Sequence, residues 1–261
     1  MPRSLLWRMF LWLRSQGKQH EERKTVKVQI LSHTENPEQI IAAAAKLCYS
    51  QKADIDSLMN DLTEKKVQKF VEKLESLGHE SPFEHVSFTF GIEGVSRALL
   101  AQITRHRVGA SFSVRSQRYC SEDNFGYVIP PSIAKHDVHS VRYKALMADI
   151  QKIYNRLVEL GVPKEDARMI LPNACETRMV VTMNIRELWH FFNLRCCTRA
   201  QWEIRALAHD MLVLCKEAAP VLFEHAGATC DAKGYCPEGS MSCGKAPTLE
   251  QMKADAKMIL R

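Results

Sequence analysis

The sequence predicts a single domain of the α+β class, or a mixed α/β fold. Its 261 residues are 46% hydrophobic and 25% charged, which is an ordinary globular composition. Strand-like and helix-like periods of apolar residues both occur, and the expected strands are separated by helices without a strict βαβ repeat. No internal repeat or low-complexity linker forces a division into two domains.

The first elements are expected to be one strand and two helices. Every second residue is apolar over 26–31, which is the period of a half-buried strand. An alanine-rich helix over 37–50 and a second helix over 55–77 should follow, since Pro37 suits a first helical turn and Gly78 a helix end.

The clearest alternation of apolar and polar residues predicts a strand over 85–95. A helix over 95–107 should follow it, and three polar residues near its C-terminal end would then share one face: Gln102, Arg105 and His106. Further along we expect helices over 140–160 and 162–172, a strand over 179–185, and helices over 186–195 and 200–218.

The two ends of the chain carry weaker signals. The apolar run in 1–25 is broken by arginines and is shorter than the roughly 20 residues that cross a bilayer, so we expect a disordered basic and apolar extension, with an amphipathic surface helix as the alternative. The folded domain should span 26–226, and 227–261 should form a cysteine-containing tail.

The net charge and the cysteine content indicate which kinds of ligand and which compartment suit the protein. The net charge of +6 suits anionic ligands, and phosphate-bearing small molecules fit it at least as well as nucleic acid. Cysteine occurs 9 times at irregular spacing, which favours a reduced protein of the cytoplasm over a disulfide framework. No GxGxxG, Walker, HExxH or GxSxG motif is present.

The segment RHRVGASFSVRSQRY, over 105–119, concentrates positive charge. Four arginines lie within fourteen residues, and like charges at that density repel unless an anion neutralises them: Arg105, Arg107, Arg115 and Arg118. Because the guanidinium fork binds phosphate in bidentate geometry, the segment predicts a phosphate site. A solvated helix end is the alternative interpretation.

Two further segments concentrate polar residues. GHESPFEH, over 78–85, resembles no zinc pattern closely, and as a loop it could present His79 and Ser81 to a ligand. In the helix over 186–195, Arg186 and His190 share one face, which a solvated basic surface would also explain.

Taken in order, the motifs GHESPFEH, QxxRHR, SQRY, ARMILP and NLRxxxRAQWEIR resemble those of the flavin-dependent thymidylate synthases, from about residue 26 to about residue 225. The resemblance implies methylation of dUMP with 5,10-methylenetetrahydrofolate as carbon donor, NADPH as reductant and FAD as hydride carrier, without a cysteine nucleophile. It also implies a mainly antiparallel sheet flanked by helices, and a homotetramer whose active sites are shared between subunits. No nucleic-acid or membrane partner is expected.

The resemblance assigns roles to individual residues and implies no metal. Flavin contacts fall on His79, Ser81, Glu84, Arg105, His106, Arg107, Asn184, Arg186, His190 and Arg199. Contacts to dUMP fall on Gln102, Arg105, Ser116, Gln117, Arg118, Arg168 and Arg195. Arg195 is the expected catalytic residue, and because arginine cannot act as a base at pH 7, its role must be electrostatic.

Several positions depart from the family pattern. Eight residues separate Arg107 from Ser116 where the family usually has seven, and Gly109 is the expected insertion. Val114 stands where a glutamate or glutamine is common. His190 replaces a frequent asparagine, and Arg199 replaces a frequent histidine.

Two other functions stay open on the sequence alone. A single-stranded nucleic-acid-binding module would use the basic segment with Phe112 and Tyr119 as stacking groups. A zinc-containing hydrolase would need a group of side chains that bind the metal. In the tail, zinc could bind Cys230, Cys236 and Cys243 with His225, although free thiols are the simpler interpretation.

Overall fold

The computed structural model describes residues 26–48, 50, 54–60 and 62–259. The expectation of a disordered extension over 1–25 therefore lies outside the described residues. Within the part that the structure describes, no helix is long and apolar enough to cross a membrane.

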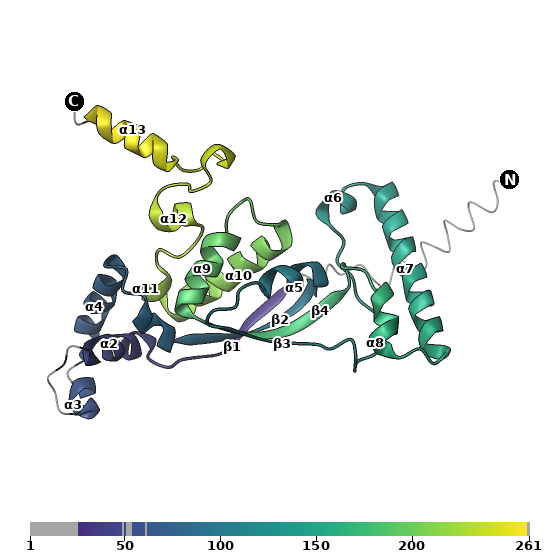
Figure 1. Cartoon of the computed structure of the whole chain (residues 1–261), viewed down its shortest axis with the longest axis horizontal. Coiled ribbons are helices and arrows are strands. Elements are labelled where there is room, and N and C mark those ends of the chain that lie inside the picture. The colour runs from purple at the N-terminus through teal and green to yellow at the C-terminus, as the bar shows by residue number, and fades with distance from the viewer. Residues whose placement is uncertain (1–25, 49, 51–53, 61, 260–261) are drawn as a thin grey trace.

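A four-stranded antiparallel sheet forms the centre of the fold (Figure 1). Its spatial order is β1-β2-β4-β3 and all three pairings are antiparallel. The strands are β1 (Lys27–His33), β2 (Ser87–Ser96), β3 (Ala110–Val114) and β4 (Glu176–Asn184). The three expected strands and the mixed α and β composition are confirmed, whereas β3 was not expected.

One face of the sheet is buried and the other is open. Phe88 and Phe90 on β2 are fully buried because α5 (Arg97–Ile103), α9 (Ile185–Arg195) and α10 (Trp202–Ala218) pack on that side. Burial of such a side chain stabilises the fold by about 1.5–3 kcal/mol. On the opposite face Leu31 and Val180 remain 50% and 40% exposed.

The remaining helices lie mainly beyond the two ends of the sheet (Figure 1). At one end are α2 (Pro37–Leu47), α3 (Ile55–Asn60) and α4 (Glu64–Ser76), and at the other are α6 (Pro131–Ala134), α7 (Asp137–Glu159) and α8 (Lys164–Ala167). The C-terminal segment forms α11 (Pro220–Phe223), α12 (Thr229–Lys233) and α13 (Leu249–Ile259). Short 3-10 turns are η2 (Ser81–His85), η3 (Arg168–Ile170) and η4 (Gly239–Met241). The helix expected over 55–77 is divided into α3 and α4.

The helix expected over 95–107 is shorter, and the prediction that Gln102, Arg105 and His106 share one helical face is wrong. The α5 helix begins after the capping residue Ser96 and retains only Gln102 of the three. Arg105 and His106 follow the helix because the chain turns there to enter β3. His106 points inward and is buried, whereas Arg105 is exposed.

Gly109 lies in the turn immediately before the unexpected strand β3. Its φ of +73° is a conformation that favours glycine, and its carbonyl accepts the backbone N–H of Asn184 at 2.9 Å. The following residues pair with β4, and Phe112 packs against the core. Gly109 is thus part of the turn that brings RHR beside the start of α9.

Candidate functional site

The AQWEIR motif anchors α5, the helix that precedes RHR. Gln201 caps α10 by accepting the backbone N–H groups of Glu203 and Ile204 at 3.0 and 3.2 Å. The carboxylate of Glu203, 2% exposed, accepts the backbone N–H of Ser96 at 2.7 Å and its hydroxyl at 2.5 Å. Because Ser96 caps α5, the starts of α5 and α10 are tied together, which fixes the direction of α5.

His106 lies at the centre of the site, between the end of α5 and α9. Its Nδ1 is 2.7 Å from Oε1 of Glu187, and its Nε2 accepts the Nε–H of Arg195 at 3.1 Å. A terminal nitrogen of Arg195 also donates to the carbonyl oxygen of Gln102 at 3.4 Å. Three motifs that are far apart in the sequence therefore meet around one buried imidazole.

The protonation state of this cluster follows from its donors. The Nε of Arg195 can only donate, so Nε2 of His106 must be unprotonated, and the proton on Nδ1 is donated to Glu187. Burial, with Arg195 and His190 nearby, lowers the pKa of His106 to about 4. Burial raises the pKa of Glu187 to about 7. His106 is thus a neutral imidazole near pH 7.

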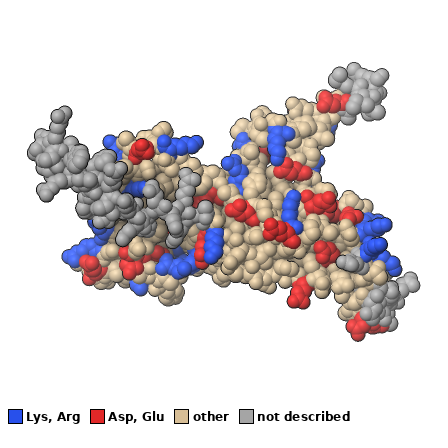
Figure 2. All heavy atoms as spheres, turned by 180° about the vertical axis from the view of Figure 1, so that it is seen from behind, with Lys and Arg blue, Asp and Glu red and all other residues tan. Residues whose placement is uncertain are grey.

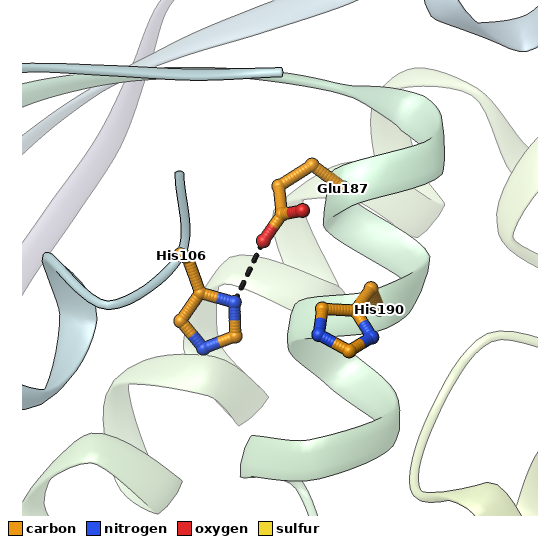
Figure 3. Close-up of side chains that lie close together, drawn as sticks. All are labelled: His106, Glu187 and His190. Atoms are coloured by element: carbon orange, nitrogen blue, oxygen red, sulfur yellow. Dashed lines mark hydrogen bonds and ion pairs between the residues drawn. The ribbon is translucent and has the colours of Figure 1, made fainter. Parts of the chain in front are cut away.

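Figure 3 shows His190 beside this pair, and the ring centroids of the two histidines are 5.6 Å apart. Donor atoms of His106, Glu187 and His190 lie within 4.8 Å of one another, which is close enough to suggest a metal site. Both nitrogens of His106 are already engaged, one as donor to Glu187 and one as acceptor from Arg195. A metal on either nitrogen would have to displace one of these contacts, so the set is better suited to hold Arg195 than an ion.

The GHESPFEH segment packs against the first turn of α9. The guanidinium of Arg186 donates to Glu80 at 3.0 Å and to Glu84 at 2.5 Å, and all three side chains are about half exposed. His79 and Ser81 are exposed on the same segment. The structure thus brings together four of the residues assigned to flavin by resemblance, namely His79, Ser81, Glu84 and Arg186.

Asn184 joins this group to the buried histidine. Its side-chain oxygen caps α9 by accepting the N–H of Glu187 at 2.9 Å. Arg105 and Arg107, which flank His106 in the sequence, are exposed. Among the described residues neither of these arginines forms an ion pair. Burial lowers the pKa of Arg195, and the positive charge of Arg105 nearby lowers it further.

The residues assigned to the phosphate of dUMP form a separate group. Arg118 pairs with the carboxylate of Glu165 at 2.8 Å, and Arg168 donates to the carbonyl oxygen of Glu165 at 3.1 Å. Gln117 is buried against Cys175, and Ser116 accepts the N–H of Arg118 at 3.2 Å, so it shapes the turn. This group lies by α8, on the side of the molecule away from α9 (Figure 1).

Arg199 is engaged by the C-terminal tail. It pairs with Glu238 at 3.1 Å and donates to the carbonyl oxygen of Met241 at 3.4 Å. The tail cysteines are not gathered: Cys236 is buried, Cys243 is exposed, and the described residues hold no group of three metal donors there. The structure therefore does not support a zinc site in the tail.

Two of the buried acids that were missed in the sequence, Glu187 and Glu203, lie on helices. Each lies four residues before a fully buried apolar side chain, Phe191 and Leu207 respectively, and so faces the core. An acid on the apolar face of an amphipathic helix is the signal that could have identified them, because such a group needs a buried donor.

The fold and the site define an α+β protein whose four strands form one antiparallel sheet in the described residues, with the guanidinium of Arg195 held beside the buried His106. A family model described as "Thymidylate synthase complementing protein" matches residues 29–221. The chain belongs to this family, and the membership predicted from the motifs is confirmed.

Individual relatives agree with the family match. A flavin-dependent thymidylate synthase of Geobacter sulfurreducens is 50% identical over 229 residues, covering 87% of this chain and 97% of the relative. That of Clostridium tetani is 48% identical over 243 residues, covering 87% and 96%. That of Pyrococcus furiosus is 41% identical over 221 residues, covering 82% and 90%.

Proposed function

We propose that the chain is a flavin-dependent thymidylate synthase, which converts dUMP to dTMP with 5,10-methylenetetrahydrofolate as carbon donor and NADPH as reductant. Its relatives carry that enzyme name. The observation that carries the proposal is the half-buried guanidinium of Arg195, held by His106 and by the carbonyl of Gln102. Within the described residues, its remaining terminal nitrogen has no protein acceptor.

In this proposal Arg195 faces the uracil ring. A fixed guanidinium stabilises negative charge that develops on the pyrimidine and favours loss of its N3 proton, without reorganisation of solvent. The neighbouring thiol is unsuited to attack, because burial raises the pKa of Cys196 to about 12 and keeps it protonated. The electrostatic role of Arg195 therefore fits this site better than attack by Cys196.

The residues present fit FAD, which would supply reversible hydride transfer. Its pyrophosphate requires cations without protein partners, and in the described part of the chain Arg105 and Arg107 meet that requirement. With them, the residues that would hold the flavin are His79, Ser81, Glu84, His106, Asn184, Arg186, His190 and Arg199. Asn184 keeps its side-chain NH2 for a ligand, whereas both ring nitrogens of His106 are engaged, so His106 would support the flavin site by packing and not by a hydrogen bond.

The phosphate of dUMP would bind Ser116, Gln117, Arg118 and Arg168. Because this group lies away from Arg195 within one chain, we propose a homotetramer in which each site combines residues of several subunits. The open face of the sheet, with exposed Leu31 and Val180, offers apolar surface for such an assembly.

A single-stranded nucleic-acid function has less support. Phe112 packs against the core as part of β3, which leaves only Tyr119, 76% exposed, as a stacking group. On the face shown in Figure 2, acidic and basic side chains of the described residues are interspersed and form no continuous basic stripe.

The test is reconstitution of the reaction. The purified chain should bind FAD, and with dUMP, 5,10-methylenetetrahydrofolate and NADPH it should form dTMP, detected by mass spectrometry. Omitting any one of these should abolish the product. A protein that takes up no FAD, or that binds single strands with steep salt dependence unaffected by dUMP, would contradict the proposal.

Sharing of sites between subunits is tested by mixing. The Arg195→Ala and Arg118→Ala variants should each be inactive, and if each site takes these residues from different subunits, co-refolded mixtures should regain about a quarter of the wild-type sites. No recovery in mixtures of confirmed hetero-oligomers would contradict a shared site.

A further inference from the structure

We propose that Glu187 is a positioning residue for Arg195, acting through His106. It accepts the Nδ1–H of that ring and thereby keeps the Nε2 lone pair turned toward the guanidinium. The catalytic consequence of this arrangement rests on the proposed function, whereas the arrangement itself can be tested without turnover.

The argument begins with the two tautomers of a neutral imidazole. With the proton on Nδ1, every contact is satisfied: Nδ1 donates to Glu187 at 2.7 Å and Nε2 accepts from Arg195 at 3.1 Å. With the proton on Nε2, two N–H donors would face each other across the same 3.1 Å contact. Glu187, as the acceptor of the Nδ1–H, therefore favours the first tautomer together with Arg195, the donor to Nε2.

The position of Glu187 is itself fixed by the fold. Its backbone N–H is donated to the side chain of Asn184 at 2.9 Å, so Glu187 lies in the capped first turn of α9. Glu187 is 6% exposed and His106 4% exposed, so water competes little for their hydrogen bond. A carboxylate that orients a histidine, which in turn acts on a third group, recurs in hydrolase triads and metal sites.

Other groups around the pair do not replace this function. From α9, His190 and the ring of Phe191 face His106 with centroids 5.6 and 5.1 Å away, and Arg195 approaches from the end of the same helix. Among the described residues, Glu187 is the one acid that contacts the ring. Loss of the Glu187 carboxylate therefore leaves the Nδ1 proton of His106 without an acceptor, and Arg195 is no longer held in one orientation.

The first experiment compares Glu187→Leu, which fills a similar volume without an acceptor, with Glu187→Gln, which keeps an acceptor oxygen. Glu217→Leu, on the exposed side of α10, is the matched control. We expect Glu187→Leu to lower kcat and kcat/KM equally by about 10–100-fold at normal flavin content, and Glu187→Gln to recover most of that loss. Wild-type kcat in Glu187→Leu, or a loss that follows flavin content alone, would overturn the proposal.

The second experiment needs no activity. In ¹⁵N-histidine-labelled full-length protein, the His106 signals, assigned with a His106→Asn variant, should report a protonated Nδ1 in the wild type. In Glu187→Leu they should report a mixture of tautomers or the Nε2-protonated form. An unchanged tautomer would contradict the role of Glu187, whereas failure of the wild type to form dTMP with the expected tautomers would contradict only the proposed function.

Discussion

Arg195 donates its Nε–H to Nε2 of His106 at 3.1 Å, although the two residues are 89 positions apart in the sequence. This contact sets the direction of a guanidinium before any ligand is bound. A charge that is already oriented costs little reorganisation when a transition state forms, which is the main advantage of electrostatic catalysis.

Replacement of Arg195 should separate turnover from flavin binding. For Arg195→Ala we expect a loss in kcat of about 100–1000-fold, the range seen when a fixed electrostatic group is removed, with flavin content close to wild type. Arg195→Lys should recover little, because an ammonium cannot satisfy His106 and Gln102 in the same planar geometry. Product formation and the absorbance of bound flavin are the measurements, and Arg142→Ala on the exposed side of α7 is the control. Full turnover by Arg195→Ala would contradict the assigned role.

Gly109→Ala should destabilise the fold through the cap of α9. A methyl group at this position would collide with the side-chain amide of Asn184, and the φ of +73° is unfavourable for any residue with a Cβ. Gly161→Ala is a matched control. Gly161 also has a positive φ, of +85°, but a Cβ added there would meet no heavy atom within 4 Å. We expect Gly161→Ala to cost about 1 kcal/mol and Gly109→Ala about 2–3 kcal/mol in urea unfolding. Equal costs would mean that the contact with Asn184 contributes nothing.

Glu203→Ala should be among the more damaging single substitutions in this chain. It leaves the N–H and hydroxyl of Ser96 buried without acceptors, and it releases α5 from α10. We expect a loss of about 2–4 kcal/mol in the free energy of unfolding. The exposed Glu217→Ala on α10 should change the stability by less than about 0.5 kcal/mol. A urea midpoint of Glu203→Ala equal to that of the wild type would show that this carboxylate is not an anchor.

The elements with strong periodicity could be predicted from the sequence. The strand over 85–95 alternates between a buried face and a polar face, and α9 and α10 carry wide apolar stripes, so burial alone specifies them. β3 could not be predicted this way, because ASFSV has few large apolar residues and its strand forms only when β4 supplies a partner.

The candidate site could likewise be predicted only in part from the sequence. The sequence singled out the polar segments, but it did not indicate that His106 would be buried against Glu187 while Arg118 and Arg168 would contact Glu165. These relations depend on long-range packing: the anchor between Ser96 and Glu203 directs α5, and the turn after α5 directs His106. Spacing along a helix does not contain that information.

Glu238→Ala should release Arg199 from the tail. The pair is 3.1 Å long and both side chains are about 40% exposed, so solvent screens it and its contribution should be below about 1 kcal/mol. If Arg199 binds flavin, the variant should bind FAD up to about fivefold more tightly, since the guanidinium no longer has an internal competitor. The measurement is FAD titration by fluorescence quenching, with Glu159→Ala on α7 as the control. Weaker FAD binding by Glu238→Ala would show that Glu238 supports the site instead of competing with the cofactor.

The opposite pKa shifts of His106 and Glu187 should largely cancel in the pH dependence of the free energy of unfolding, and one substitution should uncover the contribution of His106. The pKa of His106 is lowered from 6.5 to about 4, so between these values the unfolded chain binds a proton that the folded chain does not, and stability rises with pH. The pKa of Glu187 is raised from 4.5 to about 7, so in that window the folded chain binds the extra proton and stability falls with pH. Between about pH 4.5 and 6.5 the two effects oppose each other in the wild type.

Glu187→Leu removes the second effect and leaves the first, because burial and Arg195 still lower the pKa of His106. Relative to the wild type, the variant should therefore become more stable as pH rises from about 4.5 to 6.5, by about 2–3 kcal/mol. Urea unfolding at three pH values measures this difference, and Glu217→Leu should show a difference that does not vary with pH. A constant difference for Glu187→Leu would mean that the two groups do not titrate as a buried pair, because both shifts arise mainly from the same burial.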